Sequence, residues 1–358
     1  MSPVQQARFA GCLIGQCLGD ALGFPVEKES AAVCARYIEE CVKPGKMVAN
    51  SRGPFAVGQY TDDSQLAREL VISLVACRGF DPSDYAGRLA RLFVEGRVVW
   101  GGSVVEEAAR RIAAGVPWQQ AGTPAPHASN GSAMRAAPLG LLFAHDVAAL
   151  RAAAAQQSRI THQDVRSAAG AIALACATAL ALTESQIDPK AVSGKLAEWT
   201  RDHDPLLAEA LREMPQWLRL APAEVFLRVC QVGTRPARYD GWEGITPFVT
   251  HSVLWSLYAF LTYPESYREA VCLALAAGGD VDTTAAMTGA LVGARVGLGG
   301  IPAAMAALVH DQGAWGYGQL VHLAGECSTI AASAMRVEDR GEMGKGEAEP
   351  ATPADRGR

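Results

Sequence analysis

The segment that decides the fold is residues 9–27, which read FAGCLIGQCLGDALGFPVE. Its glycines recur every four residues, at positions 11, 15, 19 and 23, so they share one face of a helix. Glycine inside a helix costs up to about 1 kcal/mol relative to alanine, so a row of glycines predicts that another backbone packs closely against it. The polar residues Gln16 and Asp20 interrupt the apolar run and argue against a membrane span. We therefore expect a buried central helix that ends at Phe24-Pro25.

The remainder of the chain also has helical rather than strand periodicity. Residues 28–60 carry the spacing of loop glycines and prolines. No segment alternates with the period of a strand, and no nucleotide-binding glycine loop follows a strand. We predict one all-α domain at 1–335 and a charged, disordered tail at 336–358. Helices are expected at 64–77, 83–95, 103–114, 137–156, 163–182, 190–201, 204–219, 222–231, 248–262, 265–277, 283–296 and 301–311.

Composition narrows the class of protein. Hydrophobic residues make up 49% and aromatic residues only 7% of the 358 residues, which suits closely packed helices. A net charge of −5 argues against a general nucleic-acid binder. The nine cysteines form no C-x-x-C pair, so we expect buried thiols in a reducing compartment rather than a zinc site or disulfides. The N-terminus has no charged region before a clean apolar core, and we expect a cytoplasmic protein.

Two acidic clusters lie about 220 residues apart, each where a helix is expected to begin. The first is Thr61-Asp62-Asp63, where Asp62 with Gln65 has the pattern of a helix cap. The second is Asp280-Val281-Asp282-Thr283, which follows Gly278-Gly279 and precedes a helix expected to begin at Thr283 or Thr284.

Together the clusters contain more carboxylate than capping requires. Four clustered negative charges repel one another, and two divalent cations would neutralise them. Oxygen-only ligands favour Mg²⁺ or Mn²⁺ over zinc. Each cluster taken alone also fits an ordinary helix cap, so the residues by themselves leave both interpretations open.

Three other sites carry weaker signals. The loop Asn130–Arg135 places a glycine, a hydroxyl and a guanidinium together, as phosphate-binding loops do, although a plain turn with a solvated arginine has the same pattern. Thr161 and Asp164 have the spacing of a capping box, which places His162 in the first turn of the helix at 163–182, where a neutral imidazole is favoured. A surface histidine is the alternative interpretation. Nothing local marks Glu27.

Taken together, these segments resemble the ADP-ribosylglycohydrolase family. The resemblance runs in order over residues 5–320. The paired acidic clusters are its most specific part, and Val281 departs from the threonine common at that position. The matching stretches are Gly11–Gly15, Gly19–Glu27, Tyr60–Ser64, Asn130–Arg135, Ile160–His162 and Gly278–Ala285.

The resemblance implies an all-α fold and a role for each matching residue. Asp62, Asp63 and Glu27 are expected to be catalytic. Two Mg²⁺, or Mn²⁺, are expected as cofactors. The substrate is expected to contact Gly131, Ser132, Met134 and His162. The implied metal ligands are Thr61, Asp62, Asp63, Asp280, Asp282 and Thr283.

The implied reaction is hydrolysis of the glycosidic bond between ADP-ribose and an acceptor, with the metals holding the distal ribose diol. The expected partners are an ADP-ribosylated protein or a small ADP-ribose conjugate, with ADP-ribose as product. The chain is expected to act as a monomer, away from membranes. Two alternatives stay open: a magnesium-dependent phosphoester or pyrophosphate hydrolase, and a non-catalytic relative that only binds ADP-ribose.

The acceptor itself carries no sequence signature. Arginine, serine, a nucleic-acid base or O-acetyl-ADP-ribose could each be the leaving group. The acceptor groove is expected among the loops at 43–60, 97–103 and 233–247. Candidate rim aromatics are Trp100, Tyr239 and Trp242, each of which could equally pack in the core.

Overall fold

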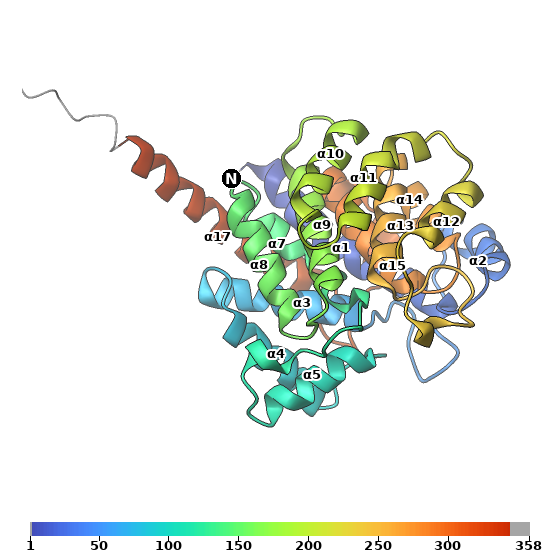
Figure 1. Ribbon diagram of the computed structural model, residues 1–358, viewed down its shortest axis with the longest axis horizontal. Helices are drawn as coiled ribbons and strands as arrows, with labels where there is room; N and C mark the ends of the chain where they lie inside the picture. Colours follow the sequence, from blue (N-terminus) through green and yellow to red (C-terminus); the bar gives the residue numbers. More distant parts are fainter. Residues whose placement is uncertain (1, 344–358) are drawn as a thin grey trace, which may run out of the picture.

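The computed structural model describes residues 2–343, and within that range it contains helices and isolated bridges but no β-sheet. The all-α class is confirmed (Figure 1). Short 3₁₀ or π segments are η1 (Phe24–Val26), η2 (Ile38–Val42), η3 (Asn130–Ser132), η4 (Ala237–Tyr239) and η5 (Leu298–Gly300). The α-helices are α1 (Pro3–Gly23), α2 (Ala31–Tyr37), α3 (Asp62–Cys77), α4 (Pro82–Val94), α5 (Ser103–Ala113), α6 (Trp118–Ala121), α7 (Ala137–Leu142), α8 (Val147–Arg159), α9 (Val165–Thr183), α10 (Pro189–Thr200), α11 (Pro205–Trp217), α12 (Pro222–Gln231), α13 (Val249–Thr262), α14 (Tyr267–Leu275), α15 (Val281–Val296), α16 (Ala303–Ala306) and α17 (Tyr317–Met343).

Helices α1 and α15 meet backbone to backbone along a line of glycines. A Cβ atom placed on Gly15 would lie 2.3 Å from the carbonyl oxygen of Gly289, and one on Gly11 would lie 2.3 Å from that of Gly293. Real Cβ atoms do not approach so closely, so only glycine fits. The close packing predicted from the four-residue period is therefore confirmed. We call Gly11, Gly15, Gly19, Gly23, Gly289 and Gly293 the glycine seam.

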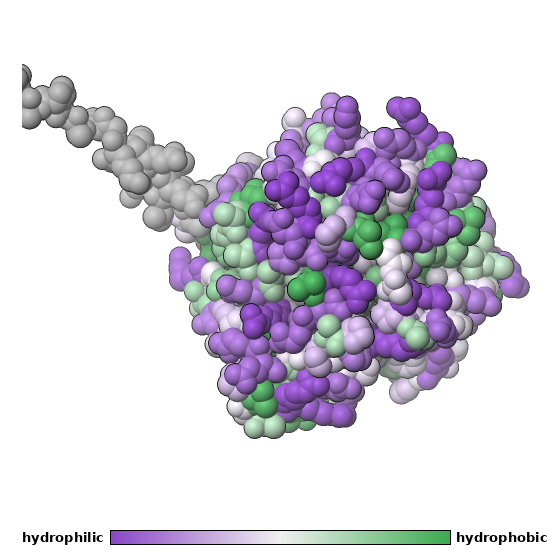
Figure 2. Space-filling model, in the orientation of Figure 1, coloured by the Kyte–Doolittle hydropathy of each residue, from purple (hydrophilic) through white to green (hydrophobic). Residues whose placement is uncertain are grey.

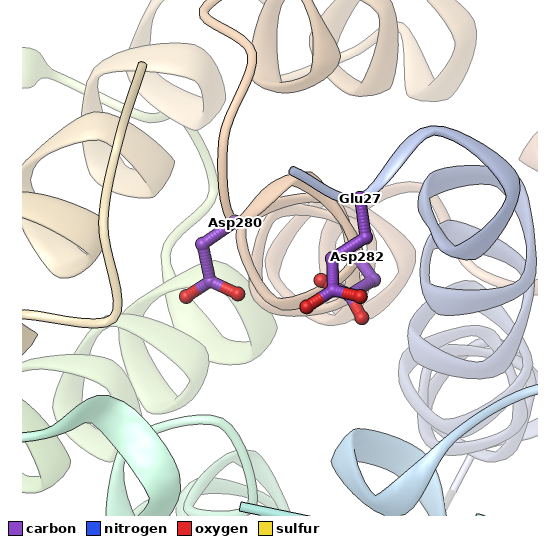
Figure 3. A group of neighbouring side chains, drawn as sticks. All are labelled: Glu27, Asp280 and Asp282. Atoms are coloured by element: carbon purple, nitrogen blue, oxygen red, sulfur yellow. The ribbon is translucent and has the colours of Figure 1, made fainter. Parts of the chain in front are cut away.

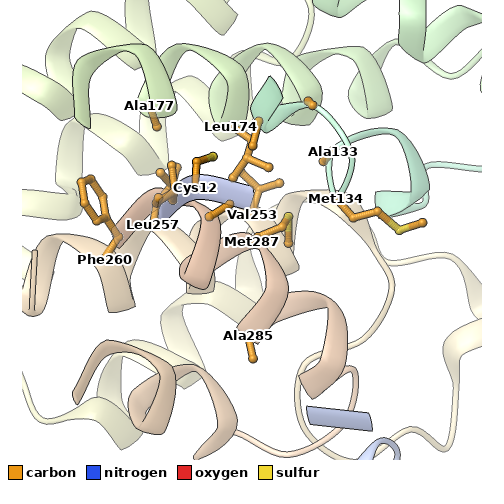
Figure 4. Packing of buried hydrophobic residues seen from close by; sticks show 14 of the residues in the cluster. Cys12, Ala133, Met134, Leu174, Ala177, Val253, Leu257, Phe260, Ala285 and Met287 are labelled. Atoms are coloured by element: carbon orange, nitrogen blue, oxygen red, sulfur yellow. The ribbon is translucent and has the colours of Figure 1, made fainter. Parts of the chain in front are cut away.

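The core is built around this seam. Cys12 of α1 packs in one apolar cluster with side chains of α9, α13 and α15, among them Leu174, Val253 and Met287 (Figure 4). Pro3–Val26 and Val165–Thr183 are long and apolar enough to cross a membrane, but 94% and 83% of their most apolar windows are buried inside the molecule. The outer face in Figure 2 is largely hydrophilic, with hydrophobic residues scattered over it. The described cysteines are free, and six of them are buried.

Several predicted boundaries are wrong. Helix α2 and segment η2 lie in the stretch 28–60 that was expected to be irregular. The single helix expected at 137–156 is two helices, because Asp146 accepts a hydrogen bond from Ala149 N and caps a new helix, α8. The helix expected at 301–311 is the single turn α16.

At the C-terminus, helix α17 crosses the predicted boundary between 335 and 336 and projects from the body (Figure 1). The tail predicted at 336–358 lies outside the described residues from 344 onward.

Three helix starts that bear on the site differ by one to three residues from the prediction. Thr61, not Asp62, caps α3, and its hydroxyl accepts from Asp63 N. Helix α15 begins at Val281 with Asp280 at the N-cap position, not at Thr283. Helix α9 is capped by Asp164 through the amide of Arg166, so His162 precedes the helix instead of lying in its first turn.

Candidate functional site

A cleft of about 570 Å³ opens where the starts of α3 and α15 come together. Its floor is acidic, and aromatic and cationic side chains stand around the rim. The lining residues are Glu27, Lys28, Asp62, Asp63, Trp100, Gly101, Gly102, Ser103, Val104, Val105, Ser129, Asn130, Gly131, Met134, Arg238, Tyr239, Trp242, Pro247, Asp280, Asp282 and Thr283.

The first acidic cluster is held by two polar residues of α1. The fully buried Asp20 carboxylate accepts hydrogen bonds from the backbone amides of Thr61, at 2.9 and 3.0 Å, and Ser64, at 3.1 Å. It also accepts one from Thr61 Oγ1 at 3.0 Å. One turn earlier, Gln16 Nε2 donates to the carbonyl of Asp63 at 3.0 Å and to that of Met134 at 2.8 Å. Gln16 and Asp20, the polar residues that interrupt the apolar helix α1, therefore hold the loops of the site in place.

The second cluster is positioned by the glycine seam and by a glycine turn. A Cβ on Gly23 would lie 2.4 Å from the Cα of Asp282, so the end of α1 touches the start of α15. Gly278 and Gly279 have φ values of +70° and +81°, the left-handed region that glycine adopts without strain. Asp280 then follows, with its amide bonded to Ile245 O at 2.7 Å.

Thr283 joins the two clusters. Its hydroxyl lies 3.3 Å from Asp63 Oδ2 and 3.1 Å from Asp280 Oδ1. Thr61 Oγ1 lies 3.2 Å from the same Asp63 oxygen. The structure therefore brings together the two clusters that are far apart in the sequence, with one threonine hydroxyl from each on a single carboxylate oxygen.

Glu27 completes the acidic floor. Ligand oxygens of Glu27, Asp280 and Asp282 lie within 4.8 Å of one another, and their side chains converge at the start of α15 (Figure 3). Glu27 accepts hydrogen bonds from Trp100 Nε1 and, at 3.2 Å, from the guanidinium of Arg52.

Burial raises the pKa of every aspartate in this floor. The pKa values of Asp62, Asp63 and Asp282 lie well above the usual range because of burial first and neighbouring carboxylates second. Burial raises the pKa of Asp280 to about 6, with Glu27 adding to the rise, and that of Asp20 to about 7. The protein alone therefore does not neutralise this group of carboxylates.

The donor set fits hard divalent cations. Every candidate ligand offers oxygen, and Asp63 Oδ1 is buried with no hydrogen-bond partner in the part of the chain that the structure describes. Two described cations beside the floor, Arg52 and Lys28, already pair with Glu27, at 3.2 and 3.6 Å. Cations at this floor would supply the missing positive charge.

The residues predicted to contact substrate separate into two groups. Gly131 and Met134 line the cleft. Ser132 is fully buried beneath it, where its hydroxyl donates to Ser167 O at 3.1 Å. His162 is also buried and is absent from the cleft lining. It lies behind Ser129, whose Oγ is 2.7 Å from His162 Nε2, and beside Gly131.

Arg135 is neither a diphosphate ligand at the surface nor a solvated turn residue. Its guanidinium is fully buried and donates to Gln157 and to Thr161 Oγ1, the latter at 2.8 Å. Burial lowers its pKa. The three candidate rim aromatics, Trp100, Tyr239 and Trp242, all line the cleft.

Sequence reasoning missed Asp20, Asn130, Ser129 and Arg238 as site residues. Asn130 Nδ2 donates to Asp280 Oδ2 at 2.6 Å, and Arg238 stands in the cleft lining. For Asp20 a signal existed, because a carboxylate on the face of a buried apolar helix requires a partner. No comparable signal marks Ser129 or Arg238 in their polar loops.

The family model described as ADP-ribosylglycohydrolase matches residues 1–338. Human ADP-ribosylhydrolase ARH3 is 28% identical over 322 residues, which cover 83% of this chain and 87% of that protein. The ADP-ribosylarginine hydrolase Tri1 of Pseudomonas putida is 27% identical over 304 residues, covering 82% of this chain and 72% of its own length.

A solved structure described as an ADP-ribosylglycohydrolase-related protein complex superposes with a TM-score of 0.66 and 27% identity, over 92% of this chain and 100% of that one. The family resemblance, the all-α fold and the enzyme class expected from the sequence are thereby confirmed. The chain belongs to the ADP-ribosylglycohydrolase family and is a glycohydrolase.

Proposed function

We propose that this protein uses two divalent cations, Mg²⁺ or Mn²⁺, to hydrolyse the glycosidic bond between ADP-ribose and an attached acceptor. The observation that carries the proposal is the junction at Thr283, where both acidic clusters meet on the cleft floor around an unpartnered oxygen of Asp63. The named relatives, an ADP-ribosylhydrolase and an ADP-ribosylarginine hydrolase, support the reaction class.

Six residues would hold the cations through carboxylate and hydroxyl oxygens: Thr61, Asp62, Asp63, Asp280, Asp282 and Thr283. When bound, the two cations would supply positive charge that orients the vicinal hydroxyls of a ribose and polarises groups bound beside them. Substrate contacts by Ser132 and His162 would be indirect, because neither side chain lines the cleft.

Glu27 is the first candidate to donate or accept a proton in the reaction. Its carboxylate lies beside Asp280 and Asp282 and is fixed by Arg52 and the indole of Trp100. A carboxyl group held at the edge of a glycosidic bond can protonate a leaving group or accept a proton from water. Asp62 is the second candidate, since the amide of Gly102 lies 3.4 Å from its Oδ2 and fixes its direction.

The test is product analysis with purified protein. Proteins ADP-ribosylated on arginine or on serine and ADP-ribosylated DNA are incubated with and without Mg²⁺, and free ADP-ribose is measured. Metal-dependent release from at least one substrate is expected, with loss of release in Asp62→Asn.

Two results would decide against the proposal. Formation of AMP from ADP-ribose itself would favour a pyrophosphate hydrolase. Tight ADP-ribose binding with no turnover of any conjugate would favour a protein that only binds the nucleotide.

A further inference from the structure

Behind the cleft wall, four buried or nearly buried side chains form one continuous line of hydrogen bonds. Arg135 Nη2 donates to Thr161 Oγ1 at 2.8 Å, Thr161 Oγ1 lies 2.7 Å from His162 Nδ1, and His162 Nε2 lies 2.7 Å from Ser129 Oγ. Arg135 and Thr161 are fully buried, and His162 is 2% exposed. Ser129 alone lines the cleft. We call Arg135, Thr161, His162 and Ser129 the relay.

The first member of the relay has no choice of direction. A guanidinium has donors only and stays charged, so Thr161 Oγ1 must accept from Arg135. The Thr161 hydrogen then needs an acceptor. Among the described residues, the only hydrogen-bond partners of Thr161 Oγ1 are Arg135 and His162.

The direction of each later bond follows. If Thr161 donates to His162 Nδ1, the imidazole carries its hydrogen on Nε2, and Nε2 donates to Ser129 Oγ. In the reverse arrangement Nδ1 would donate to Thr161, and the buried hydroxyl hydrogen would have no acceptor. An unmade buried hydrogen bond costs about 1–3 kcal/mol, so the first arrangement is favoured by about 5- to 150-fold. Burial lowers the pKa of His162 well below its usual range, with Arg135 and Arg238 adding to the effect, so the ring is neutral.

The last bond directs the Ser129 hydrogen away from His162 and toward the cleft side. Ser129 Oγ accepts from His162, and the group beside its hydroxyl on the cleft side is the phenol of Tyr239. The Ser129 carbonyl is itself held by Ser167 Oγ at 2.9 Å, which keeps the side chain at the wall. A ligand oxygen in the cleft would therefore compete with the Tyr239 phenol oxygen for the Ser129 O–H donor.

The residues beside Ser129 also present hydrogen-bond donors to the cleft. Arg238 donates to the phenol oxygen of Tyr239 at 2.8 Å, and both residues line the cleft. Burial raises the pKa of Tyr239, while Arg238 and the adjacent Ser129 hydroxyl oppose the rise. Among the described residues, no carboxylate forms a salt bridge with Arg238. This part of the wall therefore offers hydrogen-bond donors and positive charge, whereas the carboxylates of the floor offer acceptors and negative charge.

We propose that Arg135 is a positioning residue that, through Thr161 and His162, turns the Ser129 hydroxyl outward as a donor to an anionic phosphoryl oxygen of the ligand. Ser129 is then a ligand-binding residue, and His162 acts one bond behind it. The identity of the ligand rests on the proposed function, but the direction of the hydrogen bonds does not.

The direction of the relay is tested first, without ligand. Nitrogen-15 NMR of histidine-labelled, metal-free protein distinguishes the two ring tautomers. The Nε2–H form is expected for His162 in the wild type. Thr161→Ser keeps the hydroxyl and should keep this form, whereas the near-isosteric Thr161→Val should lose the single tautomer. A wild-type Nδ1–H signal would overturn the proposal.

The consequence for binding is tested by a double-mutant cycle. The probe is ADP-ribose, and its binding is measured by calorimetry in the presence of Mg²⁺. Ser129→Ala and Thr161→Val should each weaken binding about tenfold, and Thr161→Ser should restore it. Because both changes act on one hydroxyl, the double variant should bind no more weakly than Ser129→Ala. Independent effects that multiply to about a hundredfold would show only structural damage and overturn the relay. If the wild type does not bind ADP-ribose, the proposed function fails, and the tautomer alone decides for or against the relay.

Discussion

The glycine seam and the acidic floor meet at Gly23 and Asp282, yet one is a close contact between two backbones and the other is a group of crowded carboxylates. In the seam the two helix backbones are in contact, and the contact at Gly19 leaves no room for a Cβ, which would lie 2.1 Å from Ala285 O. In the floor the carboxylates crowd one another, and Asp63 Oδ1 has no hydrogen-bond partner among the described residues. The seam is complete in the protein alone, whereas the floor lacks positive charge.

This difference indicates what each region contributes. The seam stabilises the fold and sets the distance between α1 and α15. Glu27 follows α1 directly after η1, and Asp282 lies in the first turn of α15. The floor costs stability, because burial raises the pKa of its aspartates and the charged form is disfavoured. Changes in the seam should therefore lower stability, and charge-removing changes in the floor should raise it while abolishing function.

The largest effect is expected from Gly19→Ala. The added Cβ would meet the backbone at Ala285, which cannot move without separating α1 from α15. We expect a loss of at least about 3 kcal/mol in the free energy of unfolding, or failure to fold, measured by urea denaturation.

Gly194→Ala in α10 is the matched control, since a Cβ there meets nothing within 4 Å. It should stabilise by up to about 1 kcal/mol. Equal behaviour of the two alanine variants would contradict close packing at the seam.

The next prediction distinguishes the two regions by the sign of the change in stability. Asp282→Asn should reduce metal-dependent hydrolysis at least about a hundredfold, because it removes a charged ligand. In metal-free buffer the same variant should unfold at a higher temperature than the wild type, because it removes a buried charge.

The surface variant Asp202→Asn is the control, with a side chain that is 68% exposed, and it should change neither quantity. Retained activity in Asp282→Asn would refute the metal assignment. A lower metal-free melting temperature would refute the view that the floor is strained.

The same contrast explains how much could be predicted from the sequence. The seam can be predicted from the four-residue glycine period that begins with Gly11 and Gly15, because close packing of two helices leaves a local, repeating pattern of small residues. The chemistry of the acidic clusters can be predicted from their residue types. Their meeting at Thr283 depends on the seam and on the turn at Gly278-Gly279, which local pattern does not encode.

The relay was beyond prediction for a different reason. Arg135 looked like a ligand of a phosphate or a solvated residue, and it is neither. Its burial depends on tertiary contacts with Gln157, Thr161 and the ring of Tyr85, none of which is a local neighbour in the sequence. Helix starts at Asp164 and Asp280 were misplaced because Asp and Thr both cap helices, and tertiary hydrogen bonds such as that from Thr61 to Asp20 decide which one does.

A third test uses pH to probe the floor. Burial raises the pKa of Asp280 to about 6 and that of Asp20 to about 7, from an ordinary 3.8. In the unfolded chain these groups lose their protons near pH 4, while the metal-free fold holds them. Their contribution to stability is therefore full below about pH 4 and is lost as the pH rises to about 7.

Urea midpoints in the presence of a chelator should thus fall across this window. The fall should be shallower in Asp20→Asn, and Mg²⁺ should reverse it while releasing protons. A wild-type midpoint that rises from pH 4 to 7 and matches the slope of Asp20→Asn would count against charge strain in the floor.

The smallest effect should come from Asn130, which orients the floor without belonging to it. Its amide donates to Asp280 Oδ2 at 2.6 Å and to Ser252 Oγ at 3.2 Å. Because a partner of this kind fixes a ligand without carrying charge, Asn130→Ala should weaken Mn²⁺ binding by about tenfold in a calorimetric titration. Ser252→Ala removes the other contact of the same amide and should change the affinity far less. If the two variants weaken binding equally, Asn130 acts through loop packing, and the hydrogen bond to Asp280 does not set the geometry of the floor.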